Sequence, residues 1–110
     1  MIFRYRELKA YVREDFERFC GMGFDAEQIL PAILDEYRYG EDFSMAENMC
    51  IHLFVALNCG EKGMEVYGIA EKLRAVLTGA SIREVRPALG EDEAEFLEDL
   101  ELAGKLMDQA

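Results

Sequence analysis

The segment MCIHLFVALNC, from Met49 to Cys59, constrains the fold of this chain most. It is apolar at nearly every position, so a helix built from it has no polar side to turn toward water. It is shorter than the roughly 20 residues needed to cross a membrane, and His52 and Asn58 interrupt it. The segment therefore predicts a central helix covered by other helices of the chain, with no role for a membrane.

Apolar residues recur at spacings of three and four on both sides of this segment, as on one face of a helix. No stretch alternates as a strand would, and no linker or repeat is visible. We expect helices over about 3–22, from Asp25 to a stop at Gly40, over 45–58, 64–77 and 91–107, with a short capped turn at Ser81 that Pro87 limits.

Capping signals place the starts of two of these helices. Asp25 with Gln28, and Ser44 with Glu47, have the spacing of capping boxes. Pro31 lacks the N–H group that a helix interior uses. Either the second helix is kinked there, or 25–30 is a separate turn and the helix starts at Pro31. Gly60 and Gly79 are expected to end the third and fourth helices.

The length of 110 residues suits one domain with its own core. We predict an all-α fold, a single compact domain over 1–110 with about five helices and a buried central third helix. Within it, 1–79 is the helical core and 80–110 is an acidic C-terminal helical extension.

The charge of the chain is strongly negative: 23 acidic residues against 12 basic ones give a net charge of −11. Such a chain repels the phosphate backbone of nucleic acids, so direct nucleic-acid binding is not expected. A basic protein would be attracted and steered toward it.

The residue types that carry catalysis or bind metals are sparse and badly spaced. Cys50 and His52 are two residues apart on a helix and point to different sides, and no C-x-x-C pair is present. A nucleophile pair of Cys59 or Cys50 with His52 lacks a third orienting group. We expect no metal, no cofactor and no enzymatic activity, and His52 to be a core or boundary residue. The odd number of cysteines, Cys20, Cys50 and Cys59, and the polar start of the chain indicate reduced core thiols in a cytoplasmic protein.

Several small signals together resemble a known family. They are Tyr5-Arg6-Glu7-Leu8, then Phe16, Gly23-Phe24-Asp25, Ile33-Leu34-Asp35-Glu36-Tyr37, and Ala56-Leu57 in the apolar helix. This pattern resembles the all-helical immunity proteins of bacterial polymorphic toxin systems. The resemblance implies a protein that binds and neutralises a cognate toxin, often a nuclease with a basic substrate channel, and that catalyses nothing.

The stretch DEYRYGEDFSMAE, which begins at Asp35, offers a surface for such a partner. Ser44 and Glu47 are assigned to the helix cap and Tyr37 to the apolar stripe. An aromatic side chain among acids suits an interface with a basic protein. The candidate partner-binding residues are Asp35, Glu36, Tyr39, Glu41 and Asp42. The acids over 91–101 form a rival patch.

A second hypothesis from another class stays open. The surplus of apolar residues and the amphipathic stretch over 91–107 also suit a homo-oligomeric helical adaptor or regulatory protein, with a homodimer as its simplest form. The state of association distinguishes the two hypotheses.

Overall fold

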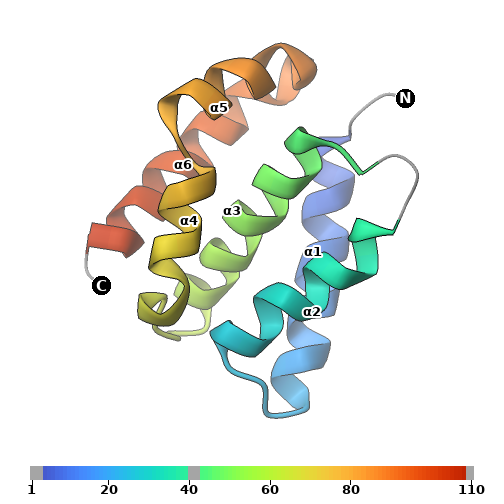
Figure 1. Ribbon diagram of the computed structural model, residues 1–110, viewed down its shortest axis with the longest axis vertical. Helices are drawn as coiled ribbons and strands as arrows, with labels where there is room; N and C mark the ends of the chain where they lie inside the picture. Colours follow the sequence, from blue (N-terminus) through green and yellow to red (C-terminus); the bar gives the residue numbers. More distant parts are fainter. Residues whose placement is uncertain (1–3, 40–42, 109–110) are drawn as a thin grey trace.

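The apolar segment forms α3 (Met45–Glu61), the central helix of the protein. The structure, a computed structural model, describes residues 4–39 and 43–108. Figure 1 shows α3 between the pair α1 (Tyr5–Gly21) and α2 (Ala26–Arg38) and the later helices. Each residue of α3 from Met49 to Ala56 is buried, as predicted for a helix without a polar side.

Within the described residues the chain is all-helical, as predicted, and has six α-helices where we expected about five. The radius of gyration, 13.0 Å, is the value of about 13 Å expected for a folded domain of roughly 100 residues. The later elements are η1 (Tyr67–Ile69), α4 (Ala70–Val76), α5 (Gly79–Val85), η2 (Arg86–Ala88), η3 (Gly90–Asp92) and α6 (Glu93–Asp108).

The second helix begins at Ala26 and runs through Pro31. The Asp25 side chain accepts a hydrogen bond from the Gln28 amide at 3.0 Å, and the Gln28 side chain accepts one from the Asp25 amide, also at 3.0 Å. The predicted capping box is therefore present. Of our two alternatives, the helix that starts at Pro31 is excluded.

The fourth predicted helix, over 64–77, is too long. The chain instead turns after α3 at Gly63, whose φ of +69° lies in the left-handed region that favours glycine. It then passes close to α2, because a Cβ atom on Gly68 would lie 2.1 Å from Oε1 of Glu27. The regular helix α4 starts only at Ala70, beyond this close approach.

The predicted cap at Ser81 and the predicted helix end at Gly79 are also wrong. Thr78 is the N-cap of α5, and its hydroxyl oxygen accepts a hydrogen bond from the Ser81 amide at 3.2 Å. Gly79 is thus the first residue of α5, and Ser81 lies inside its first turn. Pro87 falls in η2, directly after α5.

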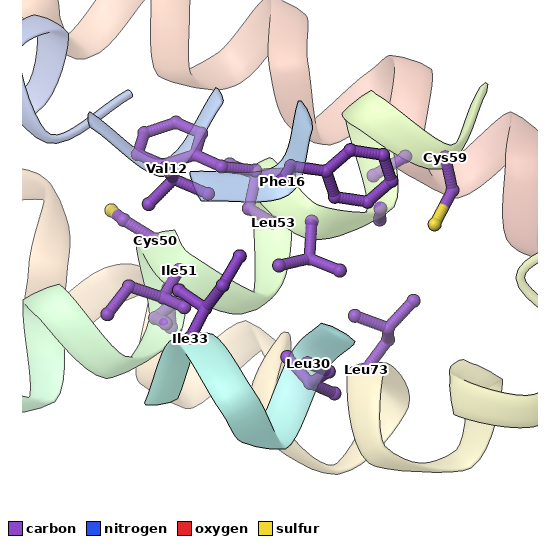
Figure 2. Packing of buried hydrophobic residues seen from close by; sticks show 14 of the residues in the cluster. Val12, Phe16, Leu30, Ile33, Cys50, Ile51, Leu53, Cys59 and Leu73 are labelled. Atoms are coloured by element: carbon purple, nitrogen blue, oxygen red, sulfur yellow. The ribbon is translucent and has the colours of Figure 1, made fainter. Parts of the chain in front are cut away.

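One hydrophobic core joins the helices. Figure 2 shows Val12 and Phe16 from α1 and Leu30 and Ile33 from α2 around the side chains of α3, with Leu73 reaching in from α4. The C-terminal part of the chain enters the same cluster through Val85, Leu89, Phe96 and Ala103. The residues over 80–108 are therefore packed onto the described residues that precede them through a shared core.

Candidate functional site

The predicted partner-binding surface lies at the C-terminal end of α2. Asp35, Glu36 and Tyr39 are all exposed there, and Tyr39 is 84% exposed. Asp35 and Tyr39 are four residues apart, so they are neighbours on one side of the helix end. Asp35 pairs with Arg38 at 3.4 Å, and both side chains are more than half exposed. Glu41 and Asp42 lie outside the described residues.

The first helix contributes to this surface, which sequence reasoning missed. Arg18 of α1 forms an ion pair with Glu36 of α2 and lies 3.4 Å from the carboxylate of Asp15. Asp15 also hydrogen-bonds to Glu36 and lies beside Tyr37. The only local signal was the i, i+3 spacing of Asp15 and Arg18, which does not say what they meet on another helix. We call Asp15, Arg18, Glu36 and Tyr37 the α1–α2 cluster.

Proton affinities in the α1–α2 cluster are shifted by burial and by neighbouring charge. Burial raises the pKa of Asp15 to about 6, and the hydrogen bond with Glu36 and its negative charge add to this effect, while Arg18 opposes it. Burial likewise raises the pKa of Tyr37 to about 12, with the charges of Asp15 and Glu36 as further causes. The ionised form of Asp15 therefore lowers the stability of the folded state.

Replacing Asp15 by Asn should stabilise the protein near neutral pH. The folded pKa of Asp15 lies above its ordinary value of 3.8, so the folded state binds this proton more tightly than the unfolded state. The contribution of Asp15 to stability is thus present below about pH 4 and is lost as the pH rises through about 6. We expect Asp15→Asn to raise the free energy of unfolding by about 1–2 kcal/mol at about pH 7.5, after allowance for the lost pair with Arg18.

Urea unfolding of both proteins at the two ends of this pH range measures the effect. The advantage of Asp15→Asn should largely disappear near pH 4, where Asp15 is protonated in the folded state and about half protonated in the unfolded state. Glu14→Gln, at the exposed neighbouring position, is the control and should change stability little at either pH. If the free energies of unfolding of Asp15→Asn and of the unchanged protein differed by the same amount at both pH values, the raised pKa of Asp15 would be contradicted.

The cysteines are free thiols, and two of them are part of the core. Burial raises the pKa of Cys50 and of Cys59 to about 12, so neither is a thiolate at neutral pH. Cys20 is half-buried, with its Sγ 3.7 Å from Sδ of Met64. The predicted assignment of Cys50 and Cys59 to the core is confirmed.

The single histidine, His52, has a structural role in α3. It is buried, and its Nδ1 lies 2.7 Å from the carbonyl oxygen of Asn48. Because a carbonyl oxygen can only accept, Nδ1 is the protonated ring nitrogen and donates a hydrogen bond to it. Burial lowers the pKa of His52 below its ordinary value of 6.5, so the ring is neutral at pH 7. The interpretation of His52 as a core residue is confirmed. No group of three or more His, Cys, Asp or Glu side chains in the described ranges is arranged to hold a metal ion.

Several acids of the rival patch over 91–101, in η3 and α6, pair with side chains of other helices. Asp99 is buried and accepts hydrogen bonds from the Tyr5 hydroxyl at 2.5 Å and from Lys9 Nζ at 2.8 Å. Arg6 Nε lies 3.2 Å from Asp92, and Arg86 forms an ion pair with Glu93. Asp35 and Glu36 are also paired inside the protein, with Arg38 and Arg18. The end of α2 is the better candidate surface because the exposed aromatic side chain of Tyr39 lies beside these acids.

The described residues define a class: an all-α domain with six α-helices and a surface at one helix end that carries acids and an exposed tyrosine. In the described ranges, no helix is both long and apolar enough to cross a membrane. No protein-family model, curated protein or solved structure matches this chain. The surface itself must therefore carry the functional interpretation.

Proposed function

We propose that this chain is a bacterial cytoplasmic immunity protein, which binds and neutralises a cognate toxin through the surface at the end of α2. The toxin is a basic protein, with a nuclease as the favoured kind. The observation that carries the proposal is Tyr39, a large aromatic side chain left 84% exposed beside Asp35 and Glu36. Tyrosine is among the residues that dominate binding energy in protein interfaces.

Charge supports the proposal in a second way. With a net charge of −11, the chain attracts a basic partner over a long range and speeds the encounter. A nuclease presents cations where it binds phosphates, and carboxylates can occupy those positions. Neutralisation by covering a substrate channel needs no catalytic group in the inhibitor, which agrees with the resemblance described from the sequence.

Co-purification with a candidate toxin, a basic protein encoded next to this chain, tests the function. The tagged chain is incubated with that protein, washed at low and then at high salt, and the complex is measured by calorimetry. A complex that survives high salt and abolishes the activity of the partner is expected. A partner that stays active in the presence of excess chain contradicts the proposal.

Two tyrosines at different places make a matched test of the surface. Tyr39→Ala should weaken the complex by about tenfold or more, as truncation of an interface hot spot does. Tyr67, in η1, is 75% exposed and serves as the control, so Tyr67→Ala should leave the affinity unchanged. Asp35→Lys should mainly slow association and reduce its dependence on salt. Equal losses for the two tyrosines would remove the end of α2 as the binding surface.

The homo-oligomeric adaptor is the second candidate, and exposed leucines on α6 favour it. Leu97 is 40% exposed and Leu102 is 51% exposed. Burial of such side chains against a second copy would stabilise a dimer. Sedimentation equilibrium over a wide concentration range tests this candidate, and a monomer at all concentrations rules it out.

A further inference from the structure

A cleft of about 580 Å³ opens between α1, α3 and α6, away from the end of α2. Its volume falls in the range of about 300–1,000 Å³ that is usual for small-molecule sites. Its walls are largely apolar and its rim carries charged side chains. The apolar lining consists of Ala10, Phe54, Leu57, Leu102 and Leu106.

The cleft continues toward a second hollow. Gly60 lets α6 approach α3 closely, since a Cβ atom there would lie 2.7 Å from Cδ1 of Leu106. Gly60 and Leu106 also line a neighbouring hollow of about 360 Å³, together with Met64, Val66 and Tyr67. The two hollows thus share one flexible leucine side chain. An elongated apolar body fits such a pair of hollows better than a compact one does.

The charges around the cleft differ from those of the whole chain. Its lining holds the cations Lys9, Arg13 and Lys105 and only two carboxylates, Glu61 and Asp99. The chain as a whole has a net charge of −11. The charge of Asp99 is already matched inside the protein by its hydrogen bond from Lys9. The lining therefore carries one more cation than carboxylates, whereas the whole chain is strongly acidic.

Two of the three cations are held weakly and can turn to a ligand. Arg13 lies 3.4 Å from Glu61 and 3.7 Å from Glu17, and all three side chains are more than half exposed. Lys105 lies 3.9 Å from Glu101, which is also exposed. Exposed pairs of this kind contribute little to stability, about 0–1 kcal/mol. Arg13 comes from α1 and Lys105 from α6, so an anionic group at the rim meets a cation on each of two walls.

We propose that this cleft binds a small anionic amphiphile, with an elongated aliphatic or aromatic body and a carboxylate or phosphate head. The body lies against Leu57, Leu102 and Leu106, and the head lies between Arg13 and Lys105. This site is separate from the surface at the end of α2 and does not depend on the proposed function.

Two probes with the same tail and opposite heads test the proposal. Dodecanoate and dodecyltrimethylammonium are titrated into the intact chain below their micellar concentrations, with heat of binding as the readout. Dodecanoate should bind saturably with one molecule per chain and at least about tenfold more tightly than the ammonium probe, as a charged hydrogen bond predicts. Equal binding of the two probes, or no saturable binding, overturns the proposal.

Two leucines on α6 provide the matched variants. Leu102→Glu places a carboxylate in the cleft and should reduce dodecanoate affinity by about tenfold or more. Leu97 is also exposed but does not line the cleft, so Leu97→Glu should leave the affinity unchanged. Lys105→Glu changes only an exposed side chain. It should weaken the binding of dodecanoate but not the binding of the ammonium probe. Equal losses for Leu97→Glu and Leu102→Glu overturn the proposal. Circular dichroism of each variant verifies the fold.

Anionic head groups also occur on the phospholipids of membranes. An experiment with vesicles distinguishes a free amphiphile from a membrane surface. Flotation with phosphatidylglycerol vesicles should leave the chain unbound, because its net negative charge is repelled by an anionic surface. Binding to vesicles without binding to monomeric dodecanoate overturns the proposal. A chain that is dimeric in sedimentation at the concentrations of the titration and binds no probe also overturns the proposal, because a second copy then covers the cleft.

Discussion

Replacement of Asp99 by Ala is expected to lower the free energy of unfolding by about 3 kcal/mol, at the lower end of the range for breaking a buried charged pair. Asp99 accepts hydrogen bonds from Tyr5 and from Lys9, and without it the fully buried Tyr5 hydroxyl has lost its acceptor. Burial and the charge of Asp99 raise the pKa of Tyr5, which keeps its hydroxyl protonated as a donor. Lys9 is partly exposed and can turn to water, which limits the loss. Urea unfolding measures it.

A neighbouring carboxylate provides the control for Asp99. Glu98 is exposed on the same helix, so Glu98→Ala should change the free energy of unfolding by less than about 0.5 kcal/mol. The double variant Tyr5→Phe with Asp99→Leu removes donor and acceptor together and should cost less than the sum of the two single changes. If Asp99→Ala lowered the free energy of unfolding no more than Glu98→Ala does, the contact of Asp99 with Tyr5 would not contribute to stability.

Phe16→Ala should cost about 3–5 kcal/mol, as for other fully buried phenylalanines. Phe16 has no exposed surface and lies among the side chains of α3 in the centre of the core (Figure 2). The neighbouring helices can only partly close the cavity that remains. Thermal and urea unfolding should both show the loss, with far-ultraviolet circular dichroism unchanged at low temperature.

Phe19 on the same helix gives the matched comparison. It is half-buried and stacks on Phe24, with ring centroids 5.3 Å apart, at the edge of the core. Phe19→Ala should therefore cost about half as much as Phe16→Ala or less. Similar losses at the two positions would contradict the placement of Phe16 in the centre and Phe19 at the edge.

The parts of the fold that could be predicted from sequence depend on local patterns. The stripe of α1 that includes Val12 and Phe16, the caps at Asp25 and Ser44, and the all-round apolarity of α3 each follow from neighbouring residues. The errors occur where two local rules compete or where a distant contact decides. Thr78 and Ser81 can both cap a helix, and only the structure shows that Thr78 does. The late start of α4 follows the close approach of Gly68 to Glu27, a contact between distant segments.

The same distinction applies to the candidate site. Exposure of Asp35, Glu36 and Tyr39 could be predicted, because they lie at the polar end of an amphipathic helix. The partnership of Asp15 and Arg18 with Glu36 could not, because it requires the crossing of α1 and α2. The cleft between α1, α3 and α6 has no local signature at all, since its lining residues are drawn from three separate helices.

The bond from Tyr5 to Asp99 also bears on how the protein is made. It joins residues 94 positions apart, so the first helix cannot complete its polar contacts until residue 99 has left the ribosome. Until then the apolar surface of α3 lacks the cover that Phe96 and Ala103 provide. Contacts between such distant residues slow folding, because a large loop must close first. The newly synthesised chain is thus exposed to aggregation for most of its synthesis, and it becomes fully folded only after α6 has been released.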